Sequence, residues 1–367
     1  MTTSTGAWDK PRAASLASLL QREGLVLARN SNGEGHEVIG DPCVVWDDDA
    51  DGWRMILFYQ PPGHGESVSP DLAASPGTWS EPVPLRFSNP ERFVGNGTHK
   101  PFLVQDPHRP GRPAFVDDHY WLYTVDTVDG GREKQIHRAR ATSLAGPWTL
   151  DADLAIPRGE EGAFDSLHVD VPTAFYFPEL GEFVCFYMGY PDQPRADLPG
   201  NPFASSIGVA LQRPDEPTAR KQGIVLDPVG EPGHWAAGYL GGIQPLPGVH
   251  HRWVAVVNAS PTAPTHDGSL TAEEPAPSLG GLAYCDEAIP LTGWRLADQP
   301  LEWIDEIPPA ALAAGEGTNL WRHHALVLGD VVRIFYNSGF YGQEQLYSKT
   351  ASAADLGIAA QPAPTLP

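Results

Sequence analysis

Polar and titratable side chains stand at the start of five short apolar segments. They are Asp41, His99–Lys100, His168–Asp170, Gln244 and His323–His324. Carboxylates and imidazoles can act as acids, bases or nucleophiles, and amines can bind an anionic group. Apolar packing does not require them, because a buried charge is costly unless it is paired or used. We therefore interpret these residues as candidates for a site. Ion pairing of Lys100 with Asp165 or Asp170 is the structural alternative.

Other residues near these segments could complete such a site. Asp165 lies close before Asp170, and Glu161 and Glu231 lie in neighbouring loops. Aromatic rings can stack on a sugar or on another ring. The aromatic candidates are Trp46, Trp235, Tyr239, Trp321 and Tyr341. Packing within the fold is the alternative role for most of them.

A repeat positions these residues. An aromatic-rich strand recurs at Trp53–Tyr59, Tyr120–Asp126, Glu182–Gly189, Arg252–Ala259 and Val331–Ser338. Each copy follows an apolar strand and precedes a third strand with small residues, with turn signals between them. Five units of three to four short strands predict an all-β fold, a five-bladed β-propeller in a single domain. One large β-sandwich is the competing architecture.

The predicted propeller covers residues 36–350, with inner strands starting near 41, 100, 170, 244 and 324. Residues 1–35 form an N-terminal segment, in which Gly24–Arg29 can supply the closing strand of the last blade and so remove an open edge. Residues 351–367 form a Pro-rich C-terminal tail, expected on the surface. Because the first strand of each blade lines the channel, the five polar strand starts should converge at one end of the axis.

The composition limits the partners and the location. With 24 Lys and Arg against 46 Asp and Glu, the formal net charge is −22. Such a chain repels nucleic acids and acidic membrane surfaces. No signal-peptide or membrane-spanning pattern is visible, which predicts a cytoplasmic protein. Cys43, Cys185 and Cys285 lie in apolar strands and are predicted to be buried free thiols.

Three stretches carry a resemblance to a known superfamily. They are GDPCVVWDDDADGWRMILFY, AGPW and GEEGAFDSLHVDVPTAFYFPELGEFVCFYMG. They resemble the five-bladed propeller glycoside hydrolases, which include arabinanases, β-xylosidases and fructan-active enzymes. The resemblance implies an enzyme of carbohydrate metabolism that hydrolyses a small glycoside or oligosaccharide in an axial pocket. It implies a base or nucleophile at Asp41 and an orienting carboxylate at Asp170, with Asp165 as its neighbour candidate. The expected substrate-binding residues are His99, Lys100, His168, Tyr239, Gln244, Trp321, Arg322, His323 and His324.

The general acid departs from the superfamily pattern. A glutamate is expected at the start of the fourth inner strand, where this sequence has Gln244. An amide cannot donate a proton to a leaving group and be regenerated. Glu161 and Glu231 are the remaining candidates for the acid.

Two other functions stay open. His99, Lys100, Arg322, His323 and His324 could form the phosphate site of a glycoside phosphorylase. Alternatively, a propeller that lost its acid could bind or remodel a non-polymeric small molecule. None of these functions requires a cofactor. The resemblance also allows a structural cation at the axis, held through His324.

Overall fold

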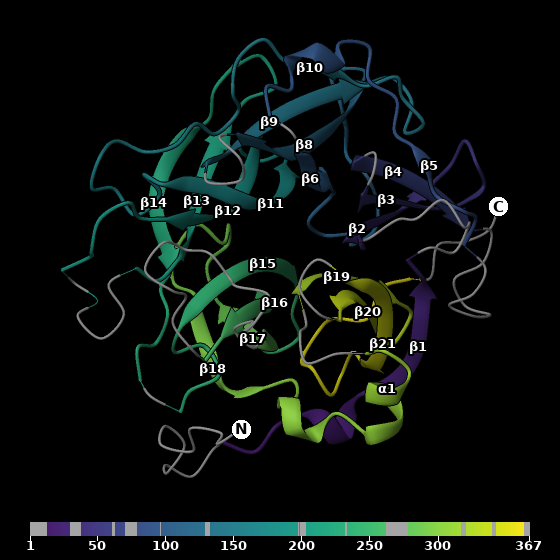
Figure 1. Ribbon diagram of the computed structural model, residues 1–367, viewed down its shortest axis with the longest axis vertical. Coiled ribbons are helices and arrows are strands. Elements are labelled where there is room, and N and C mark those ends of the chain that lie inside the picture. Colours follow the sequence, from purple (N-terminus) through teal and green to yellow (C-terminus); the bar gives the residue numbers. More distant parts are fainter. Residues whose placement is uncertain are drawn as a thin grey trace.

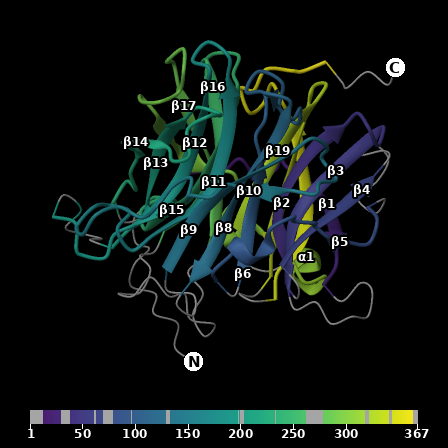
Figure 2. The same ribbon diagram turned by 90° about the horizontal axis from the view of Figure 1, so that it is seen from above.

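Five antiparallel sheets surround a central axis in the computed structural model (Figure 1). The structure describes residues 13–29, 38–60, 63–69, 79–95, 97–128, 133–196, 198, 203–231, 233–261, 278–316, 321–339 and 343–362. The predicted all-β, five-bladed propeller is confirmed. In the view turned by 90°, the long strands of neighbouring blades run side by side along the axis (Figure 2).

Each blade has an inner strand beside the axis and successive strands outward. Blade one contains β2 (Val38–Asp47), β3 (Gly52–Gln60), β4 (Gly63–Ser69) and β5 (Val83–Pro84). Blade two contains β6 (Gly97–Leu103), β8 (His119–Val128), β9 (Glu133–Ala141) and β10 (Thr149–Leu150), with β7 (Phe115–Val116) paired to β8. Blade three contains β11 (His168–Phe177), β12 (Glu182–Tyr190), β13 (Ser206–Gln212) and β14 (Arg220–Leu226).

The last two blades follow the same plan. Blade four contains β15 (Tyr239–Pro247), β16 (Trp253–Ser260), β17 (Leu279–Cys285) and β18 (Arg295–Pro300). Blade five contains β19 (Trp321–Leu328), β20 (Val331–Ser338), β21 (Gln345–Ser352) and β1 (Gln21–Leu27). The α-helix of the described residues is α1 (Pro309–Ala313), beside blade five. No helix among the described residues is long and apolar enough to cross a membrane.

Blade five is built from both ends of the chain. β1 pairs antiparallel with β21 along the outer edge of this blade. Arg22 of β1 forms ion pairs with Glu302 and Glu316, which lie in the connection between blades four and five. These contacts cover the edge that β21 would otherwise expose.

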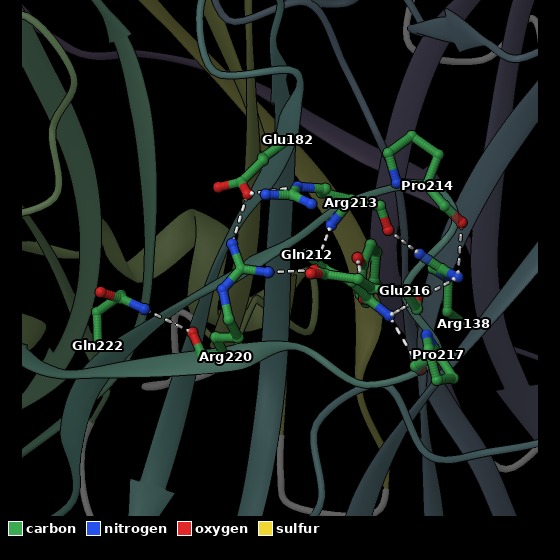
Figure 3. A network of polar contacts seen from close by, with 10 residues as sticks. Arg138, Glu182, Gln212, Arg213, Pro214, Glu216, Pro217, Arg220 and Gln222 are labelled. Atoms are coloured by element: carbon green, nitrogen blue, oxygen red, sulfur yellow. Dashed lines mark hydrogen bonds and ion pairs between the residues drawn. The ribbon is translucent and has the colours of Figure 1, made fainter.

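Polar contacts also join neighbouring blades away from the axis. Arg138 of β9 donates hydrogen bonds to the backbone carbonyls of Arg213, Pro214 and Glu216, over 3.1, 3.1 and 2.9 Å (Figure 3). The same guanidinium group lies over the ring of Trp121. Arg138 therefore ties blade two to the turn between β13 and β14 of blade three.

Each inner strand contains a β-bulge near its start. The register with the second strand shifts between Gly40 and Cys43, His99 and Phe102, Asp170 and Thr173, Leu240 and Gly242, and Trp321 and His323. The bulged residues Asp41, Lys100, Val171 and Arg322 have positive φ angles of 54°, 55°, 54° and 39°. A residue other than glycine rarely adopts this backbone conformation. Bulges next to active sites change the direction in which a side chain points. Contacts between the bulged residues of different blades, such as those of Lys100 and Arg322 with Asp41, bring the bulges together in a ring at one end of the axis.

Blade four differs from the prediction in register. Its inner strand begins at Tyr239, whereas the sequence predicted a start near Gln244. In blades one to three a proline follows the bulged residue, and Gln244-Pro245 imitates this pattern. The bulge in blade four lies instead at Gly241. A glycine stands here in place of the bulged residue and the following proline of blades one to three.

Three cysteines and the start of the C-terminal tail are buried in the core. Cys43, Cys185 and Cys285 are buried free thiols, as predicted. The start of the C-terminal tail is not on the surface, contrary to the prediction. Leu356 and Ile358 are buried against Leu246 and Val254 of blade four, because they cover apolar side chains between blades four and five.

Candidate active site at the propeller axis

Asp41 is held at the bulge of β2 by donors from two other blades. Its Oδ2 accepts the backbone N–H of Lys100 over 3.1 Å, and its Oδ1 accepts the side-chain amide of Asn337 over 3.1 Å. The Nε of Arg322 lies 3.5 Å from the same Oδ1. Asp41 also donates its own N–H to Asn337 Oδ1 over 2.7 Å. The carboxylate is thus buried and oriented, and it lies beside the positive charge of Arg322.

Asp170 lies in the strand beside the bulge of blade three and is fully buried. Its Oδ2 pairs with the ammonium groups of Lys100 and of Lys134, the latter over 2.7 Å. Its Oδ1 accepts the N–H of Val171 over 2.8 Å. Burial acts to raise the pKa of Asp170, but the two ammonium groups outweigh it and hold the pKa well below its usual range. Asp170 is therefore ionised at neutral pH.

Lys100 connects the two carboxylates. Its backbone binds Asp41 and its ammonium group binds Asp170, so one bulged residue fixes both. Burial lowers the pKa of Lys100 to about 7, against the opposing effect of Asp170 and with help from Lys134 and Arg322. The predicted ion-pair alternative for Lys100 and Asp170 is thus present. It is compatible with a site, since it joins two of the predicted catalytic residues.

Three histidines of the predicted site, His99, His323 and His324, do not add positive charge. Burial, with the nearby Lys100 and Lys134, lowers the pKa of His99 well below its usual value. Its Nε2 lies 2.6 Å from Thr127 Oγ1. Burial also lowers the pKa of His323 to about 4 and that of His324 to about 3. All three rings are therefore neutral at pH 7. The fourth, His168, is buried against the ring of Tyr190.

Protein groups contact both ring nitrogens of His324, the residue through which a cation was predicted to bind. Val44 N–H donates to its Nδ1 over 3.4 Å, and its Nε2 lies 2.8 Å from the side-chain amide of Gln105. Both ring nitrogens therefore face protein groups. Within the described ranges, no cluster of three or more His, Cys, Asp or Glu side chains could hold a metal ion. These contacts do not fit a cation bound through His324.

Several predicted residues lie outside the axial cluster. Gln244 donates to the carbonyl of Ala325 over 2.9 Å and accepts its N–H over 2.7 Å, so it joins two inner strands. Asp165 accepts the Tyr187 hydroxyl over 2.9 Å and pairs with Lys221 over 2.6 Å. These contacts occupy the Asp165 carboxylate within blade three.

The two candidate acids are exposed. Glu161 accepts a hydrogen bond from Gln193 over 2.6 Å. Glu231 borders a cleft between the outer strands of blades three and four, lined also by Ile224, Asp227 and Leu296. Neither has a described contact with Asp41 or Asp170.

The predicted aromatic residues are mostly core residues. Tyr239 and Trp235 are fully buried, and Trp46 packs edge-on against Trp53. The side chain of Trp321 and the whole of Tyr341 lie outside the described residues. Stacking on a ligand is therefore not supported for the buried rings.

The entrance of blade four carries no acid. Its residues are Tyr239, Leu240, Gly241 and Gly242. A Cβ on Gly241 would lie 2.1 Å from Asn258 Oδ1, and one on Gly242 would lie 2.6 Å from Val171 Cγ1. Neighbouring side chains already fill this space, so the bulge of blade four has no room for a carboxylic acid.

Sequence reasoning missed Lys134 and Asn337. Lys134 lies in the third strand of blade two, whereas the recurring polar pattern marks only the starts of the first strands. Asn337 lies near the end of the second strand of blade five, in the run YNS, and Asn258 lies near the end of that of blade four, in the run VNAS. This recurrence of asparagine was a usable signal.

Comparisons with known proteins support the fold. No family model and no curated protein matches the chain. Among solved structures, a thermostable family-43 glycoside hydrolase is 14% identical, with a TM-score of 0.59 over 93% of this chain and 100% of that one. The catalytic domain of a GH62 α-L-arabinofuranosidase of Coprinopsis cinerea is 10% identical, with a TM-score of 0.56 over 92% and 98%. A family 117 glycoside hydrolase of Zobellia galactanivorans is 13% identical, with a TM-score of 0.55 over 93% and 92%.

These matches cover nearly the whole chain and confirm the predicted resemblance at the level of the fold. The chain has the five-bladed propeller architecture of these glycoside hydrolases. At such low identity, the comparison carries no substrate and no catalytic residue to this chain.

Proposed function

We propose that this protein cleaves a small glycoside bound at the axial end that carries Asp41. Asp41 acts as the base or nucleophile, and Asp170 is the orienting carboxylate. The observation that carries the proposal is the ring of bulges, which brings Asp41, Lys100 and Arg322 together with Asp170. The fold that this protein shares with glycoside hydrolases supports the choice of reaction.

The surroundings of Asp41 suit this role. Donors from Lys100 and Asn337 fix its two oxygens. An oriented carboxylate can take a proton from water or attack the anomeric carbon of a sugar. Asp170 stays ionised beside its two lysines, so it can hold its neighbours in place throughout a reaction.

Among the described residues, the proposed site has no general acid that could protonate the leaving group. No described carboxylic acid contacts Asp41 or Asp170, and the bulge of blade four leaves no room for one. Cleavage without an acid requires a leaving group that departs as an anion. The rate should therefore depend steeply on the leaving group.

A panel of glycosyl fluorides, 2,4-dinitrophenyl glycosides and unsubstituted phenyl glycosides tests the proposal. Each is offered in pentose and hexose forms, with and without phosphate. We expect cleavage of the activated substrates and at least a hundredfold slower cleavage of the phenyl glycosides. Acceleration by phosphate would identify phosphorolysis. No cleavage of any member would contradict the proposal.

Binding without cleavage is the second candidate. The observation that favours it is the same acid-free entrance at Leu240–Gly242. Saturable binding of a glycoside that is never cleaved, weakened by substitution of Asp41, would support this candidate instead.

A further inference from the structure

Three basic side chains and two carboxylates lie together in the axial cluster. The cations are Lys100, Lys134 and Arg322, and the carboxylates are Asp41 and Asp170. His99 also lies among them but is neutral. Basic side chains thus gather at the axis, although the whole chain has a formal charge of −22. Burial is the largest cause of the lowered pKa of Lys100, about 7, so this lysine is only partly charged at neutral pH.

Arg322 is the cation with free donors. Its Nε faces Asp41 at 3.5 Å, and its side chain is only 12% exposed. Its terminal nitrogens Nη1 and Nη2 donate to none of the described residues. Nη1 lies 4.0 Å from where a Cβ on Gly242 would stand. Blade four therefore faces this end of the guanidinium group with a glycine and not with a polar side chain.

The backbone indicates that this position is constrained. Arg322 has a φ of +39°, which is costly for a residue with a side chain. The bulge directs the guanidinium group toward the axis beside Asp41. A buried guanidinium group with two free nitrogens matches the two oxygens of a carboxylate, which it can bind in a bidentate manner.

We infer that the axial site takes a sugar that carries one carboxylate, a uronic acid, and that Arg322 binds this carboxylate through Nη1 and Nη2. This inference rests on the proposed function, because it assigns the substrate class of the same site. Free phosphate offers the same oxyanion chemistry, so the test must separate the two sources.

Calorimetric titration of the full chain with matched sugars tests the inference. The pairs are glucuronate and glucose, galacturonate and galactose, and mannuronate and mannose, with inorganic phosphate as a separate ligand. We expect at least one uronate to bind at least tenfold tighter than its neutral partner. Arg322→Gln should reduce this ratio to less than twofold, and Arg322→Lys should retain part of it.

Arg109→Gln is the matched control. Arg109 is 68% exposed and pairs with Asp106, so its substitution removes the same charge away from the axis. This variant should keep the full preference for the uronate. Circular dichroism establishes that each variant is folded. If Arg322→Gln does not fold, Arg322→Lys decides, since an undiminished preference in that variant overturns the role of the guanidinium fork.

Three results would overturn the inference. The first is that no uronate binds at 10 mM or that each binds no better than its neutral partner. The second is an unchanged preference in folded Arg322→Gln. The third is binding of phosphate alone, lost in Arg322→Gln, which would make free phosphate the ligand.

The proposed function can fail separately. If neutral aryl glycosides are cleaved as fast as aryl uronides in an Asp41-dependent reaction, only the uronate inference is wrong. If uronates bind through Arg322 and no glycoside is cleaved, only the cleavage reaction is wrong.

Discussion

The backbone N–H of Lys100 donates to Oδ2 of Asp41 over 3.1 Å, across the boundary between blades one and two. The ammonium group of the same lysine pairs with Asp170 of blade three. Three blades are thus linked through one residue with a positive φ angle. Changes at any of these residues should affect both the stability and the chemistry of the site.

Asp170 should make folding stability sensitive to acid. Its pKa is depressed in the folded protein and is about 3.9 in the unfolded chain. Below pH 3.9 the unfolded state binds more protons, so the stabilisation is present above this pH and is lost as the pH falls toward the folded value. Urea unfolding from pH 6 to pH 3 should show a smaller loss in Asp170→Asn than in the wild type. Equal losses would contradict the assigned ion pair.

Gly242 should be intolerant of a side chain for a specific reason. A Cβ there would lie 2.6 Å from Val171 Cγ1. We expect Gly242→Ala to lower the free energy of unfolding by about 1–3 kcal/mol. Val171→Ala removes Cγ1. In the double variant, the loss in the free energy of unfolding should therefore be smaller than the sum of the losses in the two single variants. Strict additivity in urea unfolding would show that the two residues do not meet.

Asp165 should matter for stability but not for catalysis. Its carboxylate is taken up by Tyr187 and Lys221. Removing the charge leaves the partly buried Lys221 without its partner, which should cost about 1–3 kcal/mol. The folded Asp165→Asn variant should keep kcat/KM within threefold of the wild type. A hundredfold loss of kcat/KM would instead show that Asp165 acts in the active site.

The repeat was enough to predict the five blades, because strand and turn patterns are local. The location of Asp41 and Lys100 followed, since both precede a proline at the bulge of an inner strand. Blade four could not be placed in the same way. Its bulge uses Gly241 and Gly242, which carry no polar signal, while Gln244-Pro245 imitates the pattern of the other blades.

The electrostatics of the site needed the structure. His323 and His324 looked like cations in the sequence, but burial makes them neutral. Lys134 belongs to the third strand of blade two. Its contact with Asp170 depends on how the strands of blades two and three pack. Pairings between side chains of different blades are not encoded in any local pattern.

Substitution of Asp41 tests the central claim most directly. Asp47 provides a matched control, because it lies in the same strand, is also buried, and pairs with Arg54 over 2.7 Å at the other end of β2. On the best activated glycoside, kcat/KM of folded Asp41→Asn should fall by at least about a hundredfold, whereas folded Asp47→Asn should stay within threefold of the wild type. An equal kcat/KM for Asp41→Asn and the wild type would contradict the assignment of the reaction to the propeller axis.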